Sequence, residues 1–318
     1  MACRFHLLAS LLLLTACTDQ EEPDLRLGLL DWPGAEPVHL AGEIDILDED
    51  RIDCVEFENP ADLASAFRLG GVDAACLTAD FAVDLAQSIP ELNIVFTISH
   101  SVGADLVLAR TEIATMADLR GGRIGLEVNP SSAHVLDGLL RHADLEVEDV
   151  ELVSVDIADH RHAFDEHDLD ALVTHQPYAH RAMTLNGLHV VFDSSAIPWE
   201  IVDVLLTRKS VLETKDRVFD HLIDGWTETL DRIGAGSARL VEFGARRGPI
   251  SEAEYRRMLA DVEILDAEDN RRLLVEQPES MIEILERCET VLRRWGIVRR
   301  DVDLQRLPDG RFFDGPAP

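Results

Sequence analysis

Lysine is nearly missing from this sequence, in which Lys209 and Lys215 are the only two among 318 residues. Lysine and arginine together number 29 against 61 aspartate and glutamate residues, which gives a net charge of −32. A surface this acidic keeps a protein soluble and repels phosphate backbones. The composition therefore argues against nucleic acid as a partner, although it does not by itself identify a ligand.

Motifs that carry common catalytic chemistry are also missing. The chain has no GxSxG, no HExxH, no phosphate-binding loop and no cysteine paired with a histidine near the end of a strand. We therefore expect no enzymatic activity, no cofactor and no metal. The stretch 159-DHRHAFDEH-167 is the one candidate for metal binding, with His160, His162 and His167. We interpret it as a solvated helix, because residues two apart point to different sides of a helix.

No apolar run is long enough to span a bilayer. The run LLASLLLL, residues 7–14, is far shorter than the roughly 20 residues that a spanning helix needs, so it predicts a signal peptide over residues 1–16. The run ends in Leu-Thr-Ala-Cys17, which resembles the lipobox of bacterial lipoproteins, and residues 17–24 form a polar tether. We expect an exported protein, anchored by lipid on Cys17 to the periplasmic or outer face of a bacterial membrane. An ordinary secretory signal with a chance cysteine is the alternative.

Cysteine is scarce as well. The body of the protein contains Cys54, Cys76 and Cys288. An odd number excludes complete pairing and argues against a disulfide framework. Because Cys54 and Cys76 lie in apolar, strand-like runs, we expect them to be small hydrophobic side chains in the core.

Short apolar strands alternate with helical segments, and this alternation predicts an α/β fold with mostly parallel sheets. Helices are expected at PADLASAFRLG with Asn59 as cap, at SSAHVLDGLLRHA and at PYAHRAMTL. From about Ser210 long amphipathic helices follow, which predict a helical C-terminal wrap packed on an earlier sheet. The expected strands are 25–30, 51–57, 72–78, 92–98, 104–110, 123–128, 150–155, 169–174, 189–193 and 202–208.

An ordered set of segments resembles the periplasmic solute-binding proteins of the nitrate, sulfonate and taurine type, a group that includes binders of thiamine-pyrimidine precursors. The resemblance covers most of the mature chain, from about Leu25 to Leu212, and rests on the order of the segments more than on any one of them. They are LRLGLLDWPGAEP, LASAFRLGGVDAACLTAD, SVGADLVLAR, DLRGGRIGLE, SSAHVLDGLL, DALVTHQPYA and FDSSAIPWEIVDVLLTR.

The resemblance implies a type II periplasmic-binding fold, with two α/β lobes of strand order 2-1-3. Two hinge strands, ADLVLAR and VDVLLTR, would join them. The first lobe would comprise residues 25–107 and 204–318, and the second lobe residues 108–203. Cys54 and Cys76 would lie on strands two and three with strand one between them, too far apart for a disulfide.

The same resemblance implies a lipoprotein that captures a small molecule between its lobes and hands it to an ABC permease, as a monomer. The ligand stays open among a sulfonate, nitrate and a pyrimidine-like ring. A second hypothesis is a lipoprotein of this fold that acts as a ligand sensor or protein-interaction partner without its own permease. A third, an enzyme of the pyrimidine-forming branch, is disfavoured because the cysteine-rich cluster of that branch is missing.

Ligands of open α/β sheets bind beyond the carboxyl ends of the strands, so the residues that follow each strand are the candidates. Trp32 offers a flat apolar wall that the Pro33-Gly34 turn exposes, or else it is a core side chain. Asp80 either contacts the ligand or caps a helix. The candidates of the first lobe are Trp32, Pro33, Gly34, Thr78, Asp80, Ser101 and Gly103.

In the second lobe NPSSAHVL begins a helix, whose unpaired N–H groups suit an anionic or electronegative group. Ser131 and Ser132 either cap this helix or donate to a ligand. The resemblance to sulfonate and nitrate binders implies that both serines, and His134 with them, face the ligand's anionic head. The candidates of the second lobe are Ser131, Ser132, His134, Thr174, Gln176, Tyr178 and Trp199.

Two further sequence features bear on the ligand. His175-Gln176 stands where the family often has a carboxylate, which argues against a protonated amine as ligand at that point. Asp203, at the start of the second hinge strand, is interpreted as a residue that orders the hinge. Trp199 is placed to sandwich a flat ring together with Trp32 or Tyr178.

Overall fold

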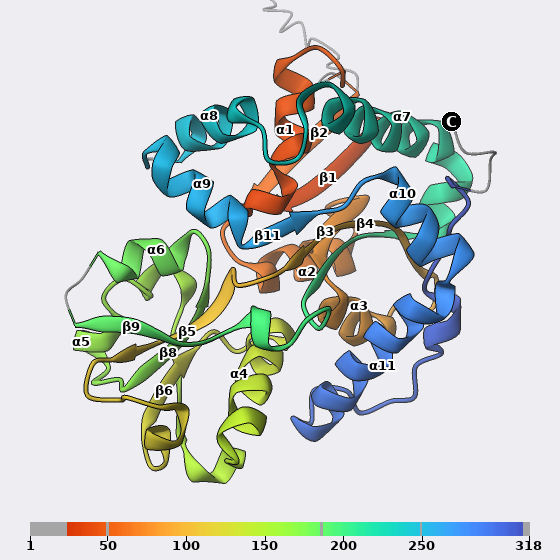
Figure 1. Cartoon of the computed structure of the whole chain (residues 1–318). Coiled ribbons are helices and arrows are strands. Elements are labelled where there is room, and N and C mark those ends of the chain that lie inside the picture. Colours follow the sequence, from red (N-terminus) through yellow and green to blue (C-terminus); the bar gives the residue numbers. More distant parts are fainter. Residues whose placement is uncertain (1–23, 49–50, 185–186, 249, 314–318) are drawn as a thin grey trace, which may run out of the picture.

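The computed structural model describes residues 24–48, 51–184, 187–248 and 250–313. The predicted signal peptide, Cys17 and the tether up to residue 23 lie outside the described residues. The described residues form two α/β lobes, each built around its own sheet (Figure 1). None of the helices described is long and apolar enough to cross a membrane.

The first lobe contains a six-stranded sheet in the order β11-β4-β10-β3-β1-β2. Strands β1 to β4 share one direction, whereas β10 and β11 run antiparallel to their neighbours. Its central strands are apolar on both sides because helices cover both faces. The bounds are β1 Leu25–Leu30, β2 Ile52–Phe57, β3 Ala74–Thr78, β4 Leu92–Ser101, β10 Val202–Arg208 and β11 Val262–Ile264.

The second lobe contains a five-stranded sheet in the order β7-β6-β8-β5-β9. β5 runs antiparallel to β8 and β9. The orders β2-β1-β3 and β7-β6-β8 confirm the expected 2-1-3 arrangement in both lobes. The strand bounds are β5 Asp105–Arg110, β6 Arg123–Leu126, β7 Glu151–Ser154, β8 Ala171–His175 and β9 Leu188–Asp193.

The chain crosses between the two sheets twice, once between Ser101 and Asp105 and once between Asp193 and Val202. β5 belongs wholly to the second sheet and β10 wholly to the first. The two strands expected to be hinges therefore follow the crossings, and the lobe boundaries expected at residues 107 and 203 fall inside them. A strand that is hydrogen-bonded on both sides is held in its sheet, so the short segments before β5 and β10 are the links between the two sheets.

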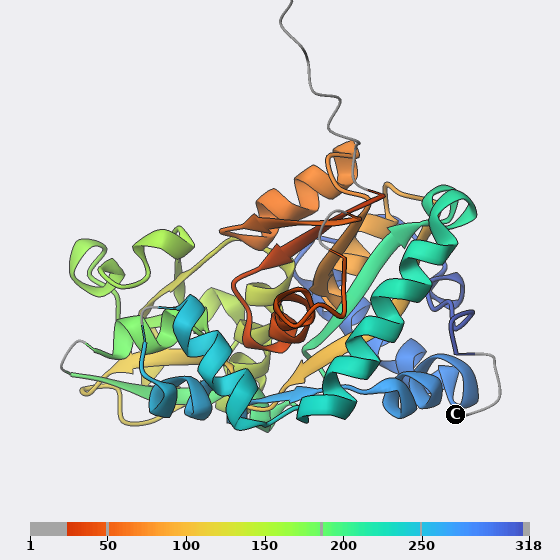
Figure 2. The same cartoon turned by 90° about the horizontal axis from the view of Figure 1, so that it is seen from above.

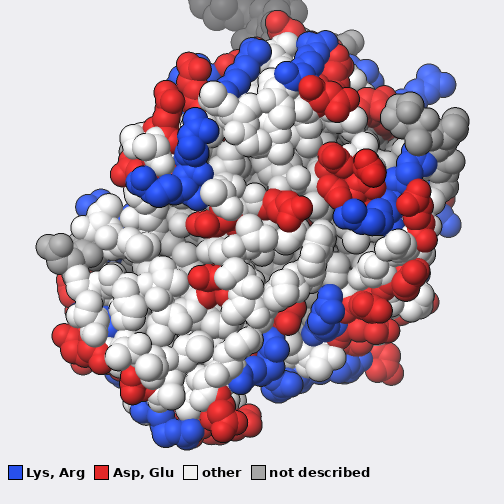
Figure 3. All heavy atoms as spheres, viewed as in Figure 1, with Lys and Arg blue, Asp and Glu red and all other residues white. Residues whose placement is uncertain are grey.

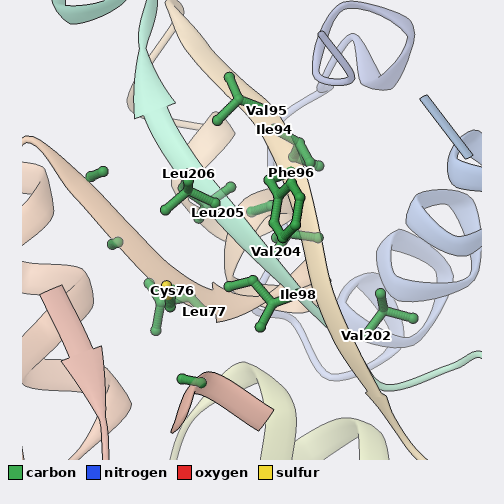
Figure 4. Close-up of a cluster of buried hydrophobic side chains, with 14 of the residues drawn as sticks. Cys76, Leu77, Ile94, Val95, Phe96, Ile98, Val202, Val204, Leu205 and Leu206 are labelled. Atoms are coloured by element: carbon green, nitrogen blue, oxygen red, sulfur yellow. The ribbon is translucent and has the colours of Figure 1, made fainter. Parts of the chain in front are cut away.

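The core of the first lobe lies between β3, β4 and β10, where Cys76, Phe96 and Leu205 point into one buried cluster (Figure 4). Cys54 on β2 and Cys76 on β3 are separated by β1 and are not joined by a disulfide, as expected. Burial raises the pKa of the Cys76 thiol well above its ordinary value. The thiol therefore behaves as a small hydrophobic group.

Long helices of the C-terminal third pack on the first lobe, which confirms the expected wrap (Figure 2). α7 packs against α1, and α11 packs against α3. Asn59 caps α2 as predicted, because its side chain accepts from the Asp62 N–H at 2.8 Å. The α-helix bounds are α1 Glu36–Glu43, α2 Pro60–Leu69, α3 Ala79–Ala86, α4 Pro130–Ala143, α5 Ala163–Glu166, α6 Tyr178–Met183, α7 Lys209–Ile233, α8 Ala238–Arg247, α9 Glu252–Ala260, α10 Ala267–Arg271 and α11 Pro278–Arg294.

Candidate ligand-binding site

A cavity lies between the two lobes, and side chains of both lobes line it. Its empty space is about 590 Å³, including the mouth that opens to solvent. The lining residues of this interlobe cavity are Leu30, Trp32, Pro60, Leu77, Thr78, Phe81, Asp105, Asn129, Ser131, Ser132, Val135, Val173, Thr174, His175 and Asp203.

The strand directions explain why these residues meet. Leu30, Thr78 and His175 end the parallel strands β1, β3 and β8. Asp105 and Asp203 lie at the start of β5 and β10, and both strands run antiparallel to their neighbours. The beginning of an antiparallel strand lies beside the end of a parallel one, as the pairs Asp105 with His175 and Asp203 with Thr78 show. The cavity therefore occupies the edge of the sheets where α/β proteins bind ligands.

A chain of hydrogen bonds fixes Trp32 in the wall of the interlobe cavity. Trp32 Nε1 donates to Ser99 Oγ at 3.2 Å, and this hydroxyl donates to Asp203 Oδ2 at 2.6 Å. A Cβ on Gly34 would lie 2.3 Å from Ser99 Oγ, so glycine is required behind the tryptophan. Burial raises the pKa of Asp203 to about 7, and the nearby Asp105 adds to the rise.

Two polar groups of the cavity are buried without partners within the described residues. They are Asp105 Oδ2 and Thr78 Oγ1. Asp105 is 7% exposed, and burial raises the pKa of its carboxyl group. A buried polar atom without a partner costs free energy, and a ligand that bonds to it recovers that cost.

The N-terminus of α4 contributes Ser131 and Ser132 to the cavity, but neither serine caps the helix. Asn129 is the cap, and its side chain accepts from the Ser132 N–H at 2.9 Å. The capping alternative for the two serine hydroxyls is therefore wrong. Glu127 accepts from Asn129 Nδ2 at 2.9 Å, so the helix start already has a polar partner of its own.

Of the candidates predicted from the sequence, Trp32, Thr78, Ser131, Ser132 and Thr174 line the interlobe cavity. The others lie elsewhere, for reasons that their contacts give. Pro33 and Gly34 are buried in the turn behind Trp32. At the first crossing, Ser101 Oγ and the Gly103 N–H both bond Ser194 Oγ. Gln176 Oε1 accepts a hydrogen bond from the His180 N–H. Tyr178 lines a neighbouring surface hollow, and Trp199 stacks on His100.

Asp80 and His134 meet across the lobes and do not line the cavity. Asp80 Oδ1 lies 2.6 Å from His134 Nδ1, and both side chains are 0% exposed. Thr78 occupies the N-cap position of α3, so the expectation that Asp80 caps this helix is wrong. Burial opposes a charge on His134, but the Asp80 charge and the hydrogen bonds to Asp80, Cys288 and Glu200 together raise the pKa of His134 well above its ordinary value.

The pair extends into a larger network of charges, which we call the interlobe ion cluster. His134 Nε2 lies 3.0 Å from Glu200 Oε2, which also accepts from Arg141 Nη2 at 2.7 Å. Arg294 Nη1, at the end of α11, donates to Asp137 Oδ1 at 2.6 Å. The cluster joins α3, α4, α11 and the second crossing, and it consists of Asp80, His134, Asp137, Arg141, Glu200 and Arg294.

Neither group of potential metal ligands has the chemistry of a metal site. Asp80, His134 and Cys288 lie close enough to share an ion, but both ring nitrogens of His134 already bond carboxylates. A histidine must offer an unprotonated nitrogen to a metal, and this imidazole is held in its charged form. In the stretch 159–167, His160 turns inward to bond Thr174 Oγ1 at 3.0 Å, whereas His162 is exposed. The helix expected over this stretch is reduced to α5.

Asp105 is the main cavity residue that the sequence analysis does not identify. For Asp203 the sequence analysis predicts a role in the hinge and not in the cavity. A signal was present, because each aspartate begins the strand that follows a crossing, in ADLVLAR and VDVLLTR. His175 was also missed as a lining residue, and its ring meets Trp32 edge to face at 6.0 Å. Leu77, Phe81 and Val135 form apolar parts of the cavity wall. In the sequence these three residues have the same apolar pattern as core residues, so they could not be identified as lining residues.

Comparisons with known proteins agree with this architecture. A model of the NMT1-like family matches residues 18–239. An aliphatic sulfonates-binding protein of Escherichia coli K12 is 29% identical over 150 residues, 46% of this chain and 47% of that protein. A thiamine biosynthesis protein of Haemophilus influenzae is 27% identical over 134 residues, 40% of this chain and 42% of that protein. The chain thus matches under half the length of each curated relative.

Solved structures show the same fold over nearly the whole chain. The ligand-binding component of an ABC-type import system from Staphylococcus aureus, with zinc bound, has a TM-score of 0.75 and 13% identity over 92% of this chain and 98% of that chain. The periplasmic aliphatic sulphonate-binding protein of Escherichia coli has a TM-score of 0.68 and 20% identity over 91% and 99%. The desulfurization enzyme DszB shares the fold too, with a TM-score of 0.64 and 16% identity over 92% and 98%.

Proposed function

Because the chain belongs to the NMT1-like family, we propose that it is the solute-binding component of an ABC importer. The observation that carries this proposal is the interlobe cavity, which both lobes line beside the two short crossings. A small molecule bound there touches both lobes, so its binding energy favours the closed arrangement. The sulfonate-binding relative and the importer component of the same fold support this role.

We propose that the solute leaves the cavity unchanged. Within the described part of the chain no cysteine lines the cavity, and Cys76 and Cys288 are buried in the first-lobe core. The fold alone does not decide this point, because it is shared with a desulfurization enzyme. Recovering a bound solute intact by mass spectrometry after prolonged incubation supports binding without turnover, and a chemically altered product contradicts it.

The cellular location is a proposal that rests on the sequence Leu-Thr-Ala-Cys17. We propose that Cys17 carries the lipid that holds the protein, as a monomer, at the outer or periplasmic face of a bacterial membrane. Cys17→Ser is expected to move the protein from the membrane fraction to the soluble fraction. A variant that stays with the membrane contradicts lipid anchoring at this residue.

Ligand binding and closure together test the main proposal. The Cys17→Ser chain is purified and titrated calorimetrically with small solutes of both charges. Small-angle X-ray scattering then follows the radius of gyration, which is expected to fall when a bound solute closes the lobes. A chain that binds no small solute contradicts the proposal, whereas a chain that binds one but supports no uptake fits a sensor of the same fold.

A further inference from the structure

The interlobe cavity is lined by two carboxyl groups, and its described lining has no lysine or arginine beside them. Asp105 and Asp203 both line it, whereas among the described lining residues there is no lysine and no arginine. The two aspartates come from different sheets, and each begins the strand that follows a crossing. A ligand between the lobes therefore meets a carboxylate from each side.

Among the described residues neither carboxyl group has a lysine or arginine as ion-pair partner. Asp203 Oδ2 accepts from the Ser99 hydroxyl, and Asp105 Oδ2 is buried without a partner in the described structure. His175 also lines the cavity, but its Nδ1 bonds the Gln176 carbonyl oxygen at 2.8 Å, so at most Nε2 remains for another group. A buried carboxylate without a counter-charge is costly, so an ionised carboxyl group in this cavity favours a cationic partner.

An anionic ligand would make this imbalance worse. Once both aspartates are ionised it would add a third negative charge, and like charges in a dry site repel strongly. The start of α4 gives little compensation, because Asn129 caps it and Glu127 lies beside the cap. In Figure 3 acidic groups also lie near the middle of this face, in the band between the two lobes.

We infer that the solute is a small organic cation, an amine, amidine or guanidine on an apolar body, whose N–H groups lie between Asp105 and Asp203. This inference rests on the proposed solute-binding role and names the class of solute. An N–H cation forms short, charge-assisted hydrogen bonds with carboxylates, and a flat amidine can engage both oxygens at once. The apolar body contacts Trp32, Phe81 and Val135.

The inferred class differs from the anionic head that resemblance to sulfonate binders implies for Ser131 and Ser132. Hydroxyl groups can accept as well as donate, so both serines suit either ligand. The carboxylate that the sequence lacks before Pro177 is supplied from two other positions, Asp105 and Asp203. The doubt that His175-Gln176 raised about a protonated amine therefore does not hold for this cavity.

Matched probes of opposite charge test the inference. The Cys17→Ser chain is titrated calorimetrically at pH 8 with benzamidine and benzylamine, and with benzenesulfonate and benzoate, which carry the same ring. We expect at least one of the two cations to bind and both anions to bind at least tenfold more weakly. An anion that binds better than both cations overturns the inferred class but leaves the solute-binding role intact. A chain that none of the probes binds counts against the inferred class, and failure with a broad solute panel counts against the role itself.

Substitution of a single carboxylate separates binding from overall charge. Asp203→Asn is expected to weaken binding of the cationic probe about tenfold or more, because a hydrogen bond to a charged partner is lost. Asp231→Asn, on the exposed side of α7, makes the same charge change and is expected to leave affinity unchanged. Unchanged affinity in Asp203→Asn and in Asp105→Asn, with melting temperatures near that of the parent, overturns the inference.

The pH dependence distinguishes ionised acceptors from protonated donors. Since the pKa of Asp203 is about 7 in the empty protein, the affinity for benzamidine is expected to rise between pH 5 and pH 8. The rise is about tenfold per pH unit at most. An affinity that falls over this interval shows that the carboxyl groups donate protons to the ligand, and it overturns the inference. Other titratable groups that act on this pair are His175, His134 and Asp80.

Discussion

The boundary between the lobes has two polar regions that differ in whether their charges are paired. In the interlobe ion cluster, His134 lies between Asp80 and Glu200, and Arg294 bonds Asp137. In the interlobe cavity, Asp105 and Asp203 have no lysine or arginine partner among the described residues. A region whose charges are paired within the protein holds the structure, whereas buried carboxyl groups without a counter-charge leave bonding capacity that a ligand can use.

A single helix, α4, contributes residues both to the cavity and to the interlobe ion cluster, so the two regions can be compared along one element. The first turn of α4 brings Ser131 and Ser132 to the cavity, and later turns bring His134, Asp137 and Arg141 to the cluster. Residues three and four apart share a face of a helix, so the three cluster residues line up toward α3 and α11. Figure 1 shows these three helices close together at the lobe boundary. The same helix therefore connects the two regions.

Breaking the interlobe ion cluster is expected to give the largest effect. His134→Ala leaves Asp80 buried without its partner, and removing one member of a buried pair costs about 3 to 5 kcal/mol. The free energy of unfolding, measured by denaturant titration at neutral pH, is expected to fall by that amount. His162→Ala removes an exposed imidazole, so it is expected to change stability by less than about 0.5 kcal/mol.

The pH dependence of the same variant has a defined sign. The pKa of His134 is raised in the folded protein, so its stabilising contribution is complete below the ordinary pKa of 6.5. The contribution is lost as the pH rises through the higher value of the folded state. The stability difference between the parent and His134→Ala should therefore be larger at pH 6 than in alkaline solution. If the stability difference is the same at pH 6 and in alkaline solution, the imidazole of His134 is neutral in the folded protein.

At the start of α4, neighbouring residues have different roles, because Asn129 caps the helix whereas Ser131 and Ser132 line the cavity. Asn129→Ala is expected to lower the free energy of unfolding by about 1 kcal/mol, because the cap is lost. The double variant Ser131→Ala with Ser132→Ala is expected to keep nearly the parent stability and to weaken benzamidine binding by about tenfold. Denaturant titration and calorimetry measure the two effects. The reverse pattern would return the two serines to a purely structural role.

Much of the fold could be predicted from the sequence because the strands are apolar and separated by clear turns. All ten expected strands are present, from β1 to β10, and the order 2-1-3 recurs in both sheets. The short β11 was missed because three residues, Val262 to Ile264, carry no periodic signal. The crossings were misplaced because apolar runs show where strands lie but not which sheet they join.

The site was less accessible to sequence reasoning, since it depends on contacts between distant segments. Asp80 looked like a helix cap, yet its partner His134 is 54 residues away on the other lobe. The sequence is compatible with Ser131 or Ser132 as the cap of α4, whereas in the structure Asn129 occupies the N-cap position. Asp105 could have been noticed as a charged residue opening an otherwise apolar strand. Its lack of a partner is a property of the folded cavity alone.

The two tryptophans that were expected to sandwich a ring give the smallest and most specific test. Trp32 lines the interlobe cavity, whereas Trp199 stacks on His100 at 3.9 Å outside it. Trp32→Phe removes the hydrogen bond to Ser99 and part of the wall, so benzamidine binding is expected to weaken about fivefold. Trp199→Phe keeps a ring over His100 and is expected to leave that affinity unchanged.

The change in tryptophan emission on ligand binding tests the same two variants independently of the affinity. The chain has four tryptophans, and of these the cavity lining contains Trp32. A benzamidine-induced change in emission is therefore expected to disappear in Trp32→Phe and to persist in Trp199→Phe. If the change persists in Trp32→Phe and disappears in Trp199→Phe, the ligand lies against the second crossing. The aromatic contact of the ligand would then be assigned to Trp199 beside His100.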